Sequence, residues 1–159
     1  MVKNQSAGLL LYRKFKNHLE VFLVHPGGPF WKNKDENTWS IPKGEFDESE
    51  EPLRAAIREF LEETGIPVSG EFIELQPIIQ KGGKKVFAWA LEKNIDAAAI
   101  QSNHFEMEWP PRSGKMSLFP ETDKAEWFAL SDARKKILTG QLSFLDQLEG
   151  MLEKKKHNQ

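Results

Sequence analysis

Three glutamates in residues 44–66 are spaced so that they could bind a metal ion together. Glu59 precedes Glu62 by three residues and Glu63 by four, so on a helix they lie on, or border, one face. Like charges at this spacing repel, and the helix dipole disfavours acids in the last turn. A hard divalent cation such as Mg²⁺ relieves both problems, because it takes oxygen ligands and joins carboxylates to substrate phosphates. A solvated acidic face is the commoner fate of an isolated cluster, so the surrounding residues must decide.

The residues around these acids predict a helix over residues 51–64. Pro52 suits the first turn, where its missing N–H costs nothing, and Gly65 suits the position just past the end. The opposite face of this helix carries an apolar stripe that can pack on a sheet, formed by Leu53, Ala56, Ile57, Phe60 and Leu61. The acids would then face outward over a cleft.

A glycine and an arginine accompany the three acids. Gly44 follows the run 39–43, and a glycine between a strand and a loop lets a ligand approach the backbone closely. Arg58 has two interpretations: it could clamp a substrate, or it could orient the carboxylates, for instance by pairing with Glu50.

The whole segment resembles the Nudix box, the signature of hydrolases that cut a nucleoside diphosphate linked to another group. The pattern is a Gly, five residues, a Glu, seven residues, then Arg-Glu-bulky-x-Glu-Glu-x-Gly-bulky. Every specified position is present between Gly44 and Ile66, with Phe60 in a bulky slot that is usually aliphatic. The resemblance extends over most of the chain, from residue 6 to about residue 150, although only the box is highly specific.

The resemblance implies a metal-dependent attack of water on phosphorus. Its cofactor would be Mg²⁺, with Mn²⁺ as a substitute, held by the Gly44 carbonyl and by Glu59, Glu62 and Glu63. Arg58 would orient the carboxylates, so that Glu50 is more structural than catalytic. The general base would be a box glutamate, Glu62 first, or an acid before the last strand, for which Glu121 is the candidate. An ordinary loop carboxylate is the alternative interpretation of Glu121.

Several residues outside the metal set could bind the substrate. The basic candidates are Lys43, Lys81, Lys84, Lys85 and Arg112, and the aromatic ones are Trp31 and Phe87. The lysine turn could hold an extended polyphosphate, although a solvated turn has the same composition. Phe87 and Trp89 alternate on one strand, so core packing is the better interpretation for at least one of them.

The arrangement is similar to the diadenosine tetraphosphate hydrolase branch of the Nudix family. The similar parts are the entry over residues 39–45, the lysine-rich turn before an aromatic strand, and a terminal helix. Cleavage of diadenosine tetraphosphate to ATP and AMP is therefore the first hypothesis. The alternatives are a house-cleaning (d)NTP pyrophosphohydrolase that releases pyrophosphate, a non-catalytic nucleotide-binding sensor, and 5′-end processing of RNA.

Composition limits the class of protein further. The chain has 159 residues, a net charge of −2 and no cysteine, so we expect no disulfide, no thiolate chemistry and no broad grip on nucleic acid or on a membrane. The histidines are scattered, without the spacing of metal ligands. We expect a cytoplasmic protein, a monomer or a homodimer, whose partner is a small nucleotide substrate.

The alternation of elements predicts an α+β protein or an α/β/α layered sandwich. The resemblance implies a Nudix-type mixed sheet flanked by helices. We expect one Nudix domain over residues 1–153 and a frayed basic tail over 154–159. The expected strands are 7–12, 19–24, 38–41, 71–80, 85–91 and 126–130, and the later helices are 132–138, capped by Ser131, and 143–154. Residues 94–115 read as a long irregular loop, either a lid or a dimer contact.

Overall fold

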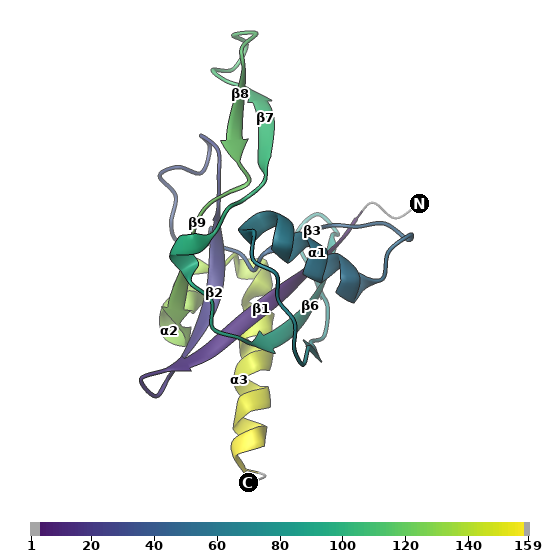
Figure 1. Cartoon of the computed structure of the whole chain (residues 1–159), viewed down its shortest axis with the longest axis vertical. Coiled ribbons are helices and arrows are strands. Elements are labelled where there is room, and N and C mark those ends of the chain that lie inside the picture. The colour runs from purple at the N-terminus through teal and green to yellow at the C-terminus, as the bar shows by residue number, and fades with distance from the viewer. Residues whose placement is uncertain (1–3, 158–159) are drawn as a thin grey trace.

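A mixed β-sheet forms the centre of the protein in the computed structural model, which describes residues 4–157 (Figure 1). Its strands are β1 (Gln5–Phe15), β2 (His18–Pro26), β3 (Lys43–Glu45), β4 (Ile73–Glu74), β5 (Ile78–Ile79), β6 (Lys85–Glu92) and β9 (Thr122–Ala129). Their order is β4-β6-β1-β2-β9, with β3 also on β1 and β5 also on β6. The β1–β6 pair is parallel and the other pairs are antiparallel.

Helices cover both faces of this sheet. The helix α1 (Pro52–Thr64) lies on one face, and α2 (Leu130–Lys136) and α3 (Leu142–His157) lie on the other (Figure 1). Two short 3₁₀ turns, η1 (Ala97–Ala99) and η2 (Thr139–Gln141), complete the connections. The expected α/β/α sandwich is therefore confirmed.

The central strand β1 is apolar on both sides because both of its faces are covered. Leu9 and Leu11 face the cluster beneath α1, whereas Leu10 and Tyr12 face the cluster beneath α3. Each cluster takes its helical side from fully buried residues: Ala55, Ala56 and Phe60 on one side, and Phe144, Leu145 and Leu148 on the other. Leu53, Ala56, Ile57 and Phe60 of the predicted apolar stripe pack in the cluster beneath α1, whereas Leu61 is exposed, so its place in the stripe is wrong.

The ends of α1 are those that the sequence predicts. Pro52 occupies the first turn, and Gly65 adopts a left-handed conformation with φ of 74°. The Gly65 N–H donates to the Leu61 carbonyl at 2.7 Å, which closes the last turn.

Two of the predicted strands are wrong in extent. Residues 38–41 make only isolated bridges, Trp39 with Ile137 and Ser40 with Val24. Pro42 cannot donate to a ladder, and the regular pairing starts only after it, in β3. The expected strand over 71–80 divides into β4 and β5, because Pro77 interrupts it in the same way.

Residues 94–115 are not an irregular loop. They contain η1 and the first strand of a hairpin, β7 (His104–Glu108), whose partner is β8 (Met116–Pro120). This hairpin projects from the body of the protein (Figure 1). Its strands alternate exposed and half-buried positions, a weak period-2 signal that the proline and glycine residues of its turn obscured. Whether it acts as a lid or a dimer contact stays a prediction.

The last three elements differ from the predicted ones at their boundaries. The last strand of the sheet starts at Thr122 rather than at residue 126, and α2 starts at Leu130 without a side-chain cap, so Ser131 is not its cap. The helix α3 continues to His157, so residues 154–157 are helical rather than frayed, because no breaker follows Gly150. Asn158 and Gln159 lie outside the described residues. No helix in the described range 4–157 is long and apolar enough to cross a bilayer.

Replacing Phe60 by alanine tests the packing that holds α1 in place. Phe60 is completely buried, so we expect the free energy of unfolding to fall by about 3–5 kcal/mol, measured by urea denaturation. Leu61→Ala is the matched control on the same helix. Its side chain is 45% exposed, and its loss should cost less than about 1 kcal/mol. Equal losses in the two variants would contradict the observed packing.

Candidate active site

Gly44 and Glu59 meet where α1 crosses the sheet. The strand β3 places Gly44 opposite Ala7 of β1, and α1 packs over the same region. A Cβ atom at residue 44 would lie 1.9 Å from the Glu59 carboxylate oxygen Oε2, so any side chain there would displace this carboxylate. The backbone of Gly44 and the carboxylate of Glu59 are consequently in direct contact.

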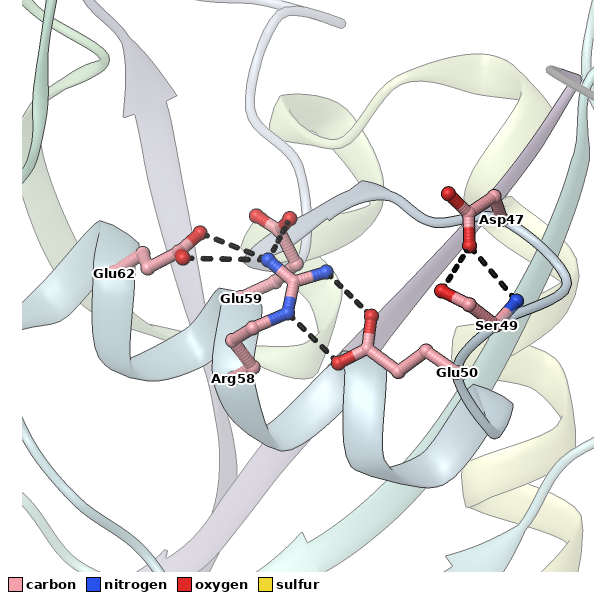
Figure 2. A network of polar contacts seen from close by, with 6 residues as sticks. All are labelled: Asp47, Ser49, Glu50, Arg58, Glu59 and Glu62. Atoms are coloured by element: carbon pink, nitrogen blue, oxygen red, sulfur yellow. Dashed lines mark hydrogen bonds and ion pairs between the residues drawn. The ribbon is translucent and has the colours of Figure 1, made fainter.

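Arg58 lies at the centre of a network of carboxylates (Figure 2). Its Nε and Nη2 atoms donate to the two oxygens of Glu50, both at 2.8 Å. Its Nη1 atom donates to Glu59 at 2.8 Å and to Glu62 at 3.1 Å. The bonds to Glu50 first, and to Glu59 next, raise the pKa of Arg58 above its ordinary value. The geometry favours the orienting interpretation of Arg58 over the substrate clamp.

A local turn holds Glu50 in position for this pairing. The Asp47 carboxylate accepts hydrogen bonds from the Ser49 N–H at 2.8 Å and from its hydroxyl at 2.5 Å (Figure 2). Such an Asx turn mimics a backbone turn and stiffens the loop. The loop therefore holds Glu50 where its carboxylate accepts hydrogen bonds from Nε and Nη2 of Arg58.

Negative charge is crowded on the inner side of the same helix. Burial raises the pKa of Glu63 to about 8, and the charges of Glu59 and Glu121 add to this, whereas Lys43 opposes it. Burial also raises the pKa of Glu59, while its hydrogen bond from Arg58 acts in the opposite direction. A set of crowded carboxylates beside the backbone of Gly44 offers the oxygen donors that a divalent cation prefers.

The side chains are not yet gathered around a single point. Among residues 4–157, no group of three or more acidic or histidine side chains lies close enough to hold a metal ion. Glu59 and Glu62 both bind Arg58 instead. A cation would therefore have to draw its ligands together, so the four metal ligands remain a prediction.

A cavity of about 220 Å³ opens beside these acids. Its lining includes Trp31, Lys43, Glu63 and Glu121, so it joins four sequence-predicted residues that come from four separate segments. A larger hollow of about 680 Å³ lies between the β1–β2 turn and α3, and none of the box residues line it. The smaller cavity is the candidate substrate pocket, because Glu63 and Glu121 line it.

The other predicted substrate residues lie outside this cavity. Lys84 donates to Glu45 at 2.6 Å, and the Lys85 ammonium lies 4.9 Å from the centre of the Phe87 ring. Phe87 also packs against Phe46 and contributes to the core beneath α1. The lysine turn, with exposed Lys81, is thus close to β3 but does not line the pocket.

Arg112 is placed far from the expected phosphate site. It lies in the turn of the projecting β7–β8 hairpin, where its N–H donates to Glu108 at 2.7 Å. Trp89 is buried in the core, which confirms the packing interpretation for one member of the Phe87 and Trp89 pair.

Sequence reasoning missed several residues beside the pocket. Thr38, Ser40 and Thr122 contribute to its lining, and no spacing pattern marks them, because they come from segments that meet only in the fold. His25, one of the scattered histidines, is buried with both ring nitrogens bonded.

The family model described as NUDIX domain matches residues 2–148. The chain belongs to the NUDIX family. Among characterised relatives of this NUDIX protein, the asymmetrical bis(5′-nucleosyl)-tetraphosphatase of Caenorhabditis elegans is 29% identical over 110 residues, which are 66% of this chain and 75% of that protein. An RNA pyrophosphohydrolase of Cereibacter sphaeroides is 50% identical, but over only 40 residues, about a quarter of each chain.

Solved structures support the same assignment. An Ap4A hydrolase from Caenorhabditis elegans in a binary complex has a TM-score of 0.64 and 25% identity, and the match covers 93% of this NUDIX chain and 98% of that one. The NUDIX domain of Shewanella oneidensis NrtR, solved with ADP ribose, has a TM-score of 0.67 at 17% identity, covering 96% and 90% of the two chains. The second likeness shows the fold alone. The family match and the hydrolase relatives indicate that this NUDIX protein is a pyrophosphohydrolase.

Replacing Gly44 by alanine tests the contact at the centre of the site. The new methyl group would displace the Glu59 carboxylate, and the misplacement of a group in the active site lowers kcat by about a hundredfold. Steady-state kinetics would measure the loss. Gly150→Ala is the control, since a Cβ there meets nothing within 4 Å. Unchanged kcat in Gly44→Ala would contradict the close approach.

The stability of the metal-free NUDIX protein should fall as the pH rises from about 4.5 to about 8. The folded pKa of Glu63 is about 8, above its ordinary value of 4.5, so the folded state binds more protons across this interval and loses stability as they leave. Thermal unfolding in a chelator would show this slope, and Glu63→Gln should flatten it. Added Mg²⁺ should raise Tm more at pH 8 than at pH 5.5, because it binds the ionised acids. If the Tm of the metal-free protein did not depend on pH, the raised pKa of Glu63 would be contradicted.

Proposed function

We propose that the protein hydrolyses dinucleoside polyphosphates and splits diadenosine tetraphosphate into ATP and AMP. The observation that carries this substrate is the likeness to the Caenorhabditis elegans Ap4A hydrolase over nearly the full length of both chains. The related tetraphosphatase sequence from the same organism agrees with it. The pocket beside the box supports the proposal, because its lining includes an aromatic residue, Trp31, for a base, and the carboxylates of Glu63 and Glu121 for the reaction.

The residues around the pocket divide the work between them. Trp31 would stack on a nucleobase, and Lys43 would neutralise phosphate charge next to the box. Burial first, and the neighbouring Lys84 next, lower the pKa of Lys43, while the nearby acids oppose this. An anionic phosphate in the pocket would favour the charged form of Lys43.

Arg58 and the carboxylates prepare the site on the other side of the pocket. Arg58 would hold the carboxylates of Glu59 and Glu62 through its ion pairs with them, while the ion pair with Glu50 fixes the Arg58 side chain. The Gly44 carbonyl and Glu59, Glu62 and Glu63 would hold Mg²⁺, which Mn²⁺ could replace. When bound, the cation supplies charge neutralisation on the phosphates and a lower pKa for a bound water.

The general base takes a proton from the attacking water. The water oxygen forms the new bond to phosphorus, the phosphoanhydride bond breaks, and the leaving nucleotide takes up the electron pair. Glu121 lines the pocket and Glu62 does not, and Glu62 is held by the Arg58 cation. This placement favours Glu121 over Glu62 as the base.

Glu121→Gln should lower kcat by about 10²- to 10⁴-fold with little change in KM, because the amide cannot accept the proton. A coupled assay for ATP or AMP release would measure both constants. Glu106→Gln on the exposed hairpin is the matched control and should keep full activity. Full activity of Glu121→Gln would return the role of base to Glu62.

A second candidate is a pyrophosphohydrolase of mononucleotides, such as the (d)NTPs. The volume of the pocket favours it, because about 220 Å³ is below the usual range of ligand sites and suits one nucleoside rather than two. The short match to an RNA pyrophosphohydrolase adds 5′-triphosphate RNA to the substrates that must be tested.

One panel assay separates these candidates. Diadenosine tetraphosphate, the (d)NTPs, ADP-ribose and a 5′-triphosphate RNA would be compared in excess Mg²⁺, with products resolved by chromatography. The proposal expects diadenosine tetraphosphate to have the highest kcat/KM and to yield ATP and AMP. Release of pyrophosphate from an NTP with a higher kcat/KM would overturn it in favour of the second candidate.

A further inference from the structure

His25 is a fully buried titratable residue that the proposed chemistry does not use. It lies near the end of β2, with 0% of its surface exposed. Its Nδ1 atom is 2.8 Å from the Asp123 carboxylate, and its Nε2 atom is 2.6 Å from the Lys34 carbonyl. The ring also packs edge-on against the buried Trp39, with 5.1 Å between the ring centres.

The chemistry of the two partners determines the protons on the ring. A backbone carbonyl can only accept, so Nε2 carries a proton and donates it to Lys34. The Asp123 carboxylate, with 32% of its side chain exposed, can accept a hydrogen bond from Nδ1–H. Each ring nitrogen of His25 thus has its own partner, in a different segment of the chain.

A buried histidine is a costly way to fill space beside Trp39. Taking its polar ring out of water costs free energy that its hydrogen bonds only partly return, and an apolar side chain of similar size can pack as well. The specific benefit of such a group is the fixed placement of the segments that it joins. The two partners of His25 indicate which segments these are.

The partners belong to two separate segments that both contribute residues to the lining of the pocket. The Lys34 N–H donates to the Trp31 carbonyl at 3.0 Å, so the carbonyl bonded by His25 belongs to the same turn as Trp31. Asp123 follows Glu121 and Thr122, which both line the pocket. The Gly27 N–H donates to the Glu121 carbonyl at 2.9 Å, which joins the start of the first segment to the second.

We propose that His25 is a positioning residue that sets the placement of Trp31 and Glu121 across the pocket. Its Nε2–H holds the segment 27–37, and its Nδ1–H holds the start of β9. The role rests on the proposed function only in the choice of an assay substrate. The tether itself is a property of the protein without substrate.

Two substitutions separate the two bonds. The amide nitrogen of asparagine takes the place of Nδ1, so His25→Asn can keep the bond to Asp123 and loses the one to Lys34. The amide nitrogen of glutamine takes the place of Nε2, so His25→Gln can keep the bond to Lys34 and loses the one to Asp123. Asp123→Ala breaks the second bond from its exposed end and leaves the buried ring in place, so it serves as the variant least prone to misfolding.

Hydrogen–deuterium exchange on the protein without nucleotide tests the tether directly. Loss of the Lys34 bond should speed exchange in residues 27–37 by about tenfold in His25→Asn. His25→Gln and Asp123→Ala should keep exchange in this segment near that of the wild type. Wild-type exchange in His25→Asn, or equal acceleration in all three variants, would overturn the proposal, because a purely space-filling residue predicts no difference between them.

Steady-state kinetics then tests the effect on the two walls. With the best substrate of the panel, His25→Asn should raise KM about tenfold with kcat retained, since it loosens the wall with Trp31. His25→Gln and Asp123→Ala should instead lower kcat with KM retained, since they loosen the wall with Glu121. If every variant changed both kcat and KM to the same extent, His25 would have only a structural role. Failure of diadenosine tetraphosphate as a substrate would sink the proposed function but would leave the exchange result to judge the tether.

Discussion

The contact between Gly44 and the Glu59 carboxylate is the constraint on which the rest of the site depends. A side chain at residue 44 would displace the carboxylate, because the carboxylate occupies the space of a Cβ atom. The contact brings the acidic face of α1 against the strand that enters the box. Everything that this helix presents, including the network around Arg58, is then placed relative to the backbone of β3.

The two faces of α1 have opposite tasks, and the sheet makes them compatible. Phe60 and its apolar neighbours bury their surface against β1, which fixes the rotation of the helix. The rotation leaves Glu59, Glu62 and Glu63 crowded, and Arg58 neutralises only part of their charge. Burial first, and the charges of Glu59 and Glu121 next, raise the pKa of Glu63, and a divalent cation would relieve the repulsion among these acids.

The substrate pocket is built by segments that lie far apart in the sequence. Trp31 follows β2, Lys43 begins β3, and Glu121 lies between β8 and β9. Hydrogen bonds between backbone atoms hold these segments together: the Asn103 N–H donates to the Glu62 carbonyl at 3.0 Å, and the Glu121 N–H donates to the Asn103 carbonyl at 2.7 Å. The base of the projecting hairpin is thus bonded both to the box helix and to the segment of Glu121.

The sequence alone determined those features that depend on residues close together in the chain. The extent of α1, its apolar stripe and the pairing of Arg58 with Glu50 all follow from helical spacing and local turns, and all were predictable. The two-sided burial of β1 was visible as an unbroken apolar run. The box motif carried the family, because its positions are defined by spacing within one segment.

Only the tertiary structure decided which distant residues meet. The lining of the pocket depends on the packing of separate loops, and neither the inclusion of Trp31 nor the exclusion of Arg112 could be read from spacing. The hairpin over β7 and β8 was missed because its pairing joins strands across a turn rich in proline and glycine. His25 shows the same limit: a single histidine has no pattern, and its two hydrogen-bond partners lie nine residues and 98 residues away.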